Sequence, residues 1–182
     1  MKTIQINREG SVKLTLSFAL LAYAVCVTAY TKNIFAFLAM FFSTTGDIAI
    51  MASRGAVTGK KERSFNIGVC AFAFAHMCYV CAMLNNNVTM AIALISFIAV
   101  SGITLFQPMD KKWNHIPYTV AIFNNAINTW LFSWVAGVGM ILFLASDLIL
   151  SVCEERNPKW QIPIWATYVP AQVFLLTAIL LK

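Results

Sequence analysis

Charged residues are scarce in this chain. Of its 182 residues only 11% are charged, with 13 Lys and Arg against 7 Asp and Glu, whereas soluble domains carry about a quarter charged residues. The apolar share is 60% and the mean hydropathy is +0.75. This balance excludes an ordinary soluble domain and predicts a polytopic all-α membrane protein. No basic run with interleaved aromatics occurs, so we expect the bilayer, and not nucleic acid, as its partner.

The cysteines are odd in number and show no paired spacing. The five cysteines lie in or beside apolar segments, which favours small buried side chains over disulfides or metal ligands. The polar residues 1–11 precede an apolar stretch without a clear cleavage site, so we expect that stretch to remain as the first helix. No pattern predicts a cofactor or a metal, and the oligomeric state is not indicated.

Apolar runs long enough to cross a bilayer divide the chain. They are 12–30, 33–52, 66–84, 88–106, 116–132, 134–152 and 161–181. If the N-terminus is cytoplasmic, seven spans place every basic residue except Lys32 and Lys182 on the cytoplasmic side, as the positive-inside rule requires. We therefore predict a single transmembrane domain over residues 1–182 in the cell membrane, with the N-terminus in the cytoplasm and the C-terminus outside. The longest connection, 53–65, is interpreted as a solvated cytoplasmic loop.

Two acids lie inside the predicted spans. Asp47 and Asp147 each stand about five residues before a cytoplasmic end, roughly 8 Å deep at 1.5 Å per residue. Ionisable groups at such positions cost several kcal/mol and are candidate functional residues. Lys and Arg are absent from the span interiors, so we expect no ion-pair partner for either acid. Two acids facing each other would favour one protonated and one ionised form, which suits acid–base chemistry.

Other polar side chains fall at the same depth and form stripes at helical spacing. Each of them could instead serve as hydrogen-bonding contacts between helices, and His76 could be purely structural. The candidates that support the two acids are Ser43, His76, Tyr79, Asn124, Asn128, Tyr168 and Gln172.

Four motifs occur in order along the chain. They are Thr44-Thr45-Gly46-Asp47-Ile48, Phe74-Ala75-His76-Met77-Cys78-Tyr79, the glycine-rich helix from Gly137 to Ser146-Asp147, and Tyr168-Val169-Pro170-Ala171-Gln172. With them the sequence resembles the lysoplasmalogenase-like membrane proteins, the YhhN-type family, over about residues 10 to 182. The chain departs from that family in having seven predicted helices where eight are usual. Lys13-Leu14 stands where the family often has Lys-Pro, and no role is assigned to Lys13.

The resemblance implies a hydrolase that cleaves the vinyl ether bond of a lysophospholipid, lysoplasmalogen, to a fatty aldehyde and a glycerophospho-alcohol. Such a reaction needs an acid to protonate carbon and a carboxylate to stabilise the resulting oxocarbenium ion, as paired carboxylates do in glycosidases. Asp47 and Asp147 are the expected catalytic pair, without assignment of which is the acid.

Three other interpretations stay open. Small-Asp sequences at Gly46-Asp47 and Ser146-Asp147 hint at two parallel three-helix repeats, which would suit a transporter of small solutes or lipids with proton-coupled aspartates. Asp47, Asp147 and His76 could together hold zinc, although their spacing does not resemble a chelating motif. A serine or cysteine nucleophile has no adjacent base in the sequence.

Overall fold

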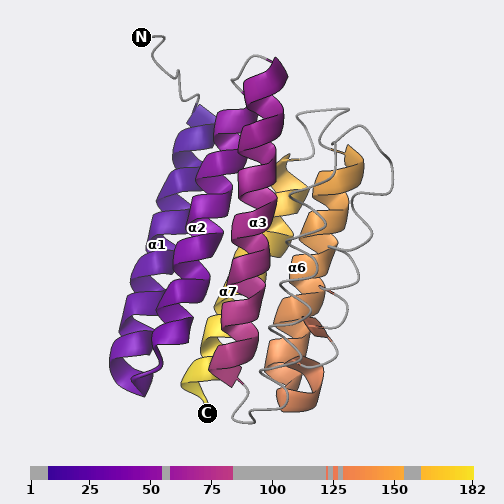
Figure 1. The fold of residues 1–182 in the computed structure, drawn as a ribbon. Helices are drawn as coiled ribbons and strands as arrows, with labels where there is room; N and C mark the ends of the chain where they lie inside the picture. The colour runs from indigo at the N-terminus through magenta and orange to yellow at the C-terminus, as the bar shows by residue number, and fades with distance from the viewer. Residues whose placement is uncertain (1–7, 55–57, 84–121, 123–124, 127–128, 154–160) are drawn as a thin grey trace.

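The structure is a computed structural model that describes residues 8–54, 58–83, 122, 125–126, 129–153 and 161–182 (Figure 1). Within these ranges it contains helices and no strand, so the prediction of an all-α fold is confirmed for them. The predicted span 88–106 lies outside the described residues and 116–132 lies largely outside them, so the count of seven stays a prediction. The long helices are α1 (Arg8–Thr31), α2 (Ile34–Arg54), α3 (Thr58–Met83), α6 (Trp134–Cys153) and α7 (Gln161–Leu180).

Four of the described helices are long and apolar enough to cross a membrane, and α6 supplies a shorter apolar segment, Trp134–Leu150. The four segments have mean hydropathies between 1.5 and 1.8. The chain therefore has the helices of a membrane protein. The orientation of its termini stays a prediction. The four candidate spans are Ser11–Thr31, Ile34–Ser53, Arg63–Met83 and Ile162–Leu180.

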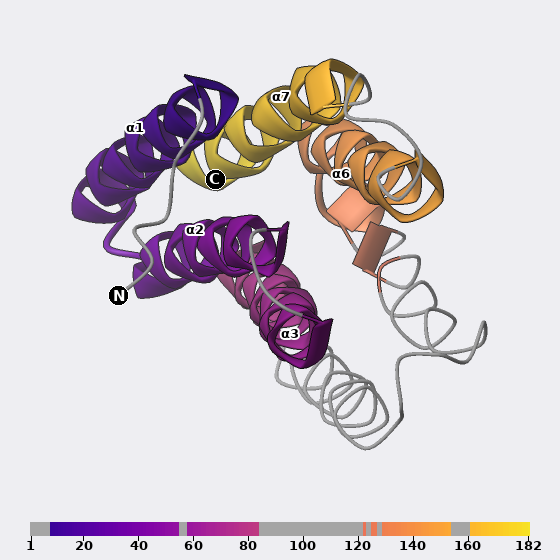
Figure 2. The same cartoon turned by 90° about the horizontal axis from the view of Figure 1, so that it is seen from above.

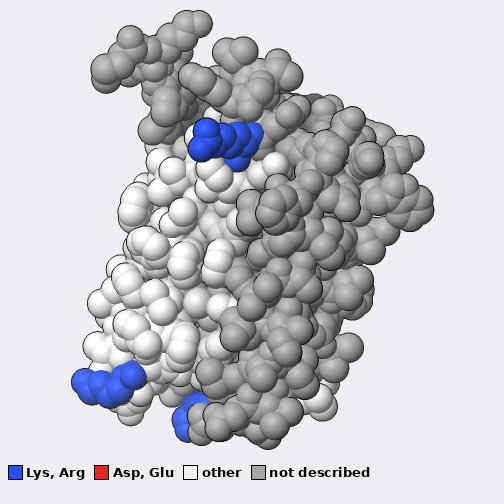
Figure 3. Space-filling model, viewed as in Figure 1, with Lys and Arg blue, Asp and Glu red and all other residues white. Residues whose placement is uncertain are grey.

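The bundle places apolar side chains outside and several polar ones inside. Phe18, Ile48 and Leu148 are each about half exposed. Figure 3 shows Lys and Arg only toward the two ends of the face in view, with an uncharged described surface between them. This distribution suits a hydrocarbon surrounding, in which polar groups need partners inside the protein. The buried polar residues include Lys13, Ser17, Ser43, Asp47, His76, Ser146 and Gln172.

The described helices form two closely packed pairs, α2 with α3 and α6 with α7, and α1 packs against α2 and α7 (Figure 2). Small residues allow these close approaches. A Cβ atom on Gly68 of α3 would lie 2.7 Å from the Ile50 side chain of α2, and one on Gly139 of α6 would lie 3.0 Å from Leu175 of α7. Each pair thus meets at a glycine.

The connection between α2 and α3 is much shorter than predicted. We expected a solvated loop over 53–65, but α2 continues to Arg54 and α3 begins at Thr58. The prediction was wrong because it took charge as a sign of a loop. Lys, Glu and Arg are good helix formers, so a membrane helix can continue into water beyond its apolar part.

The end of α3 is tied to two other parts of the bundle. The Asn33 side chain donates to the Ala82 carbonyl at 2.8 Å, and the Lys182 ammonium donates to the Met83 carbonyl at 2.9 Å. These bonds satisfy carbonyls that the helix end leaves without helical partners. They also place the α1–α2 turn, the end of α3 and the end of α7 together, at the opposite end of the bundle from the start of α1 (Figure 1).

Candidate functional site

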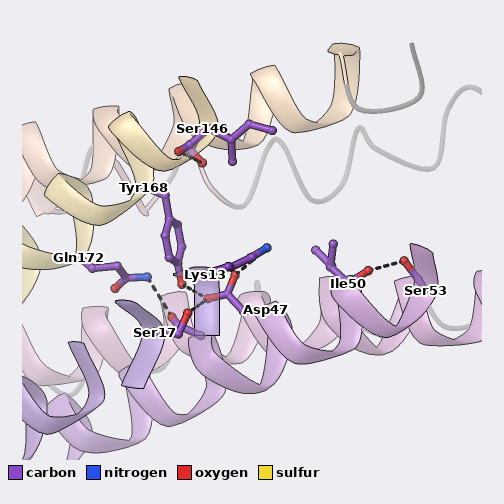
Figure 4. Close-up of polar contacts among 10 residues, drawn as sticks. Lys13, Ser17, Asp47, Ile50, Ser53, Ser146, Tyr168 and Gln172 are labelled. Atoms are coloured by element: carbon purple, nitrogen blue, oxygen red, sulfur yellow. Dashed lines mark hydrogen bonds and ion pairs between the residues drawn. The ribbon is translucent and has the colours of Figure 1, made fainter. Parts of the chain in front are cut away.

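The Asp47 carboxylate lies inside the bundle, 3% exposed, with partners from two other helices (Figure 4). The Ser17 hydroxyl of α1 donates to Oδ2 at 2.7 Å, and the Tyr168 hydroxyl of α7 donates to the same oxygen at 3.0 Å. The Lys13 ammonium of α1 stands 3.4 Å from the other oxygen, Oδ1. Both carboxylate oxygens therefore have defined and different neighbours.

The ion pair with Lys13 corrects the expectation that Asp47 has no cationic partner. Lys13 is only 7% exposed and its ammonium also lies over the Trp165 ring, 4.8 Å from the centroid. Burying a single ion costs several kcal/mol, and an opposite charge with further hydrogen bonds offsets that cost. The expectation failed because Lys13 was counted only as a charge at the end of a span. Antiparallel α1 and α2 bring the start of one helix beside the end of the other.

Gly46 explains how α2 presents Asp47 to its neighbours. A Cβ atom on Gly46 would lie 2.8 Å from the Phe72 ring of α3. The ring thus occupies the space that a side chain would take, and it also packs edge-on against Tyr168 at 6.2 Å between centroids. The glycine beside the aspartate therefore allows α3 to support the tyrosine that contacts the carboxylate.

A second polar cluster lies one helical turn from the first. The Tyr79 hydroxyl of α3 donates to the side-chain oxygen of Gln172, Oε1. The side-chain nitrogen of Gln172, Nε2, donates to the Ser43 hydroxyl at 3.2 Å. Ser43 and Asp47 are four residues apart on α2, as are Tyr168 and Gln172 on α7, so each pair shares a helix face. The structure thus brings together five predicted site residues, on three helices, in two adjacent clusters.

His76 is connected to these clusters through aromatic rings. It is buried on α3, and its ring lies 4.3 Å from that of Phe143 of α6, centroid to centroid. Phe143 in turn packs against Tyr168 at 5.5 Å. Sequence reasoning missed Phe143 because one aromatic residue in an apolar helix looks the same whether it faces lipid or the interior.

Asp147 occupies a different environment from Asp47. It is partly exposed on α6, and its neighbour Ser146 donates to the Ile164 carbonyl of α7 at 3.4 Å. Within the described ranges, α6 packs against α7 and not against α2. Asp147 follows Phe143 by four residues, so it shares the helix face that contacts Tyr168. Among the residues that the structure describes, the polar groups that contact the Asp47 carboxylate are those of Lys13, Ser17 and Tyr168.

Other sequence predictions have mixed outcomes. Asn124 and Asn128 lie outside the described residues. The cysteines whose environment the structure describes are free, and the expectation that they are buried is confirmed for Cys78. Cys70 and Cys81 are only partly buried, and for Cys26, which is exposed on α1, the expectation was wrong. Among the residues that the structure describes, no three His, Cys, Asp or Glu side chains gather as metal ligands would.

The comparisons with known proteins give one match. The YhhN family model matches residues 10–179, a segment that contains every residue of both polar clusters. Searches of the curated proteins and of the solved structures each returned no match. Since the family model covers almost the whole chain, this chain belongs to the YhhN family.

Proposed function

We propose that this protein is a membrane-embedded hydrolase that cleaves the vinyl ether bond of lysoplasmalogens. The proposal rests on membership of the YhhN family and on one observation, the buried Asp47 carboxylate held by Lys13, Ser17 and Tyr168. An ionisable group inside a membrane bundle is costly, and such groups are retained where they bind or react. A second acid, Asp147, lies on α6, which packs against α7.

The reaction divides into proton transfer and hydration. A general acid gives a proton to the β-carbon of the vinyl ether, which leaves an oxocarbenium ion at the carbon bound to oxygen. Water adds to that carbon and loses a proton to a base, giving a hemiacetal. Collapse of the hemiacetal breaks the carbon–oxygen bond and releases a fatty aldehyde and a glycerophospho-alcohol. The catalyst thus needs one proton donor and one carboxylate.

The neighbours of Asp47 favour the carboxylate role. An ammonium group and two hydroxyl donors all stabilise negative charge on its oxygens. We therefore assign to Asp47 the stabilisation of the oxocarbenium ion and the activation of water. We assign the proton donor to Asp147, which lies on α6 and, four residues after Phe143, shares the helix face that contacts Tyr168.

In this proposal the remaining predicted residues position the catalytic groups, the helices or the substrate. Tyr168 holds Asp47, while Ser43, Tyr79 and Gln172 fix the crossing of α2, α3 and α7. His76 supports Phe143, and Asn124 and Asn128 remain proposed contacts with substrate. The lipid chain would pack among apolar helix faces, with its phosphate toward the basic cytoplasmic end.

Substrate comparison in detergent tests the proposal. The purified protein is offered lysoplasmalogen, the lysolipid with a saturated alkyl ether and the acyl lysolipid, all with one headgroup. Aldehyde should appear only from the vinyl ether, because only that bond has a carbon that protonation activates. Equal cleavage of the ester, or no release of aldehyde from any of the three lipids, would contradict the assigned reaction.

A transporter remains the second candidate, and one observation favours it. The tight pairs α2–α3 and α6–α7 each meet at a glycine, and each carries a small residue followed by aspartate. This likeness fits a duplicated unit, as several transporters have. Proteoliposomes separate the two functions. Uptake of a small solute driven by a proton gradient, without aldehyde release, would support transport and contradict hydrolysis.

A further inference from the structure

We propose that Lys13 is a positioning residue for Asp47: it neutralises the buried carboxylate and fixes its orientation, and Trp165 holds the ammonium in place. The effect on turnover rests on the proposed function, whereas the pairing itself does not. The sequence motifs alone predict no role for Lys13. The inference stands on its burial, its 3.4 Å approach to Asp47 Oδ1 and its place over the Trp165 ring.

The two carboxylate oxygens are divided between different partners. Oδ2 accepts from Ser17 and Tyr168, and Oδ1 faces the Lys13 ammonium. Contacts on both oxygens prevent rotation of the carboxylate about its bond to Cβ. A lysine side chain is long and flexible, and an aromatic face that attracts the cation limits that freedom. Trp165 therefore gives Lys13 a defined place beside Asp47.

One face of α1 is built around this contact. Lys13 and Ser17 are four residues apart, so they lie on the same face, and both contact Asp47. Further along α1, the Tyr23 hydroxyl shares a hydrogen bond with Thr177 of α7 at 3.1 Å. The first helix is thus held against α7 while its first turns supply the charge and a donor to Asp47.

The groups around Asp47 set the expected dependence on pH. Within the described part of the chain, Lys13 of α1 and Tyr168 of α7 are the charged and titratable groups in contact with the carboxylate. At this level α3 presents Phe72, and its His76 packs on Phe143. A cation next to a carboxylate favours ionisation. Removing the Lys13 charge should therefore make Asp47 harder to ionise.

A double-mutant cycle tests the pair without reference to activity. Lys13→Met, Asp47→Asn, the double variant and Lys13→Arg are purified at full length, and thermal unfolding is followed in detergent. Each neutralised single variant leaves one buried charge without its partner. Both single variants should unfold at a lower temperature than wild type. The decrease in unfolding temperature of the double variant should be clearly smaller than the sum of the two single decreases. Lys13→Arg should unfold closer to the wild-type temperature than Lys13→Met does. Additive losses would overturn the proposal.

Two controls keep the cycle decisive. Lys32→Met removes the same side chain at an exposed position and should unfold as wild type does. If Lys13→Met does not accumulate as folded protein, recovery of the double variant supports the pair. If the double variant also fails while Asp47→Asn folds, Lys13 acts independently of Asp47 and the proposal is overturned.

The pH profile of aldehyde release separates positioning from simple stability. For Lys13→Met the acid limb should move to higher pH by about one unit or more, while Lys13→Arg should keep the wild-type limb. A lower rate with an unmoved limb would overturn the positioning role. If wild type releases no aldehyde, the proposed hydrolase fails, but the unfolding cycle still decides whether Lys13 and Asp47 are coupled.

Discussion

The Tyr168 hydroxyl donates to the Asp47 carboxylate at 3.0 Å, across residues 121 positions apart in the chain. One turn away, Gln172 donates to Ser43 at 3.2 Å across the same two helices. The two bonds form a register between antiparallel α2 and α7, since a shift by one turn would break both. The proposed site therefore depends on how α2 and α7 pack against each other.

Tyr168→Phe should slow aldehyde release about tenfold or more with a small change in KM. The variant keeps the ring beside Phe143 but loses a hydrogen bond to a charged group, worth about 1.5–3 kcal/mol. The measurement is kcat and KM with lysoplasmalogen. Tyr30→Phe removes a tyrosine hydroxyl from a side chain that is 78% exposed on α1, so it should keep wild-type kcat. An equal effect of the two variants would contradict the role of Tyr168.

Gly46→Ala should lower the unfolding temperature, with a cost of about 1–3 kcal/mol. The added methyl group would lie 2.8 Å from the Phe72 ring, whose movement is limited by Phe143 and Tyr168. Phe72→Leu in the same chain removes the obstructing ring. The double variant should therefore lose less than the two single losses together. Unfolding of Gly46→Ala at the wild-type temperature would mean that this close approach is absent.

Gln172→Leu and Tyr79→Phe should be coupled in their effects on stability. Gln172 accepts from Tyr79 and donates to Ser43, so either variant breaks the same chain of bonds. Hydrogen bonds between membrane helices average about 0.6 kcal/mol, so each loss should be modest. Thermal unfolding of the two singles and the double gives the coupling. If the losses simply add, the three residues do not act as one cluster.

Asp147→Asn should abolish aldehyde release, because this residue is assigned the proton donor. Asp47→Asn should lose both activity and stability, since it leaves Lys13 buried beside a neutral group. Turnover and unfolding temperature are measured for both variants. Glu155→Gln, at an acid that the sequence places in a loop, is the control for loss of charge. Wild-type turnover in Asp147→Asn would remove Asp147 from the mechanism.

The sequence predicted the helical class and several site residues because helical periodicity reports which side chains share a face. It placed Tyr168 and Gln172 together on one helix, and Ser43 with Asp47 on another. Partners on different helices depend on how those helices pack, which periodicity does not encode. Ser17 was therefore missed, although it lies only 30 positions from Asp47.

A basic residue at the end of a membrane span can either mark the cytoplasmic side or form an ion pair inside the bundle. The sequence alone does not distinguish these two roles. Lys13 is one of the basic residues that define the cytoplasmic side in the predicted topology. Its position in the sequence does not show that its side chain also contacts Asp47. A lysine with a side chain of four methylene groups can turn inward from the first turns of a helix. For each basic residue near a helix end, the sequence therefore leaves two possibilities: the side chain extends into water, or it turns into the bundle.

Aldehyde release from lysoplasmalogen by purified wild type and Asp47→Asn, run side by side, tests the central claim most directly. Asp47 is assigned the carboxylate of the reaction. Wild type should release aldehyde in proportion to lipid consumed, and Asp47→Asn should be slower by about 10²-fold or more, the scale of acid–base catalysis. Thermal unfolding confirms that the variant is folded at the assay temperature. A folded Asp47→Asn protein with wild-type turnover would contradict the account.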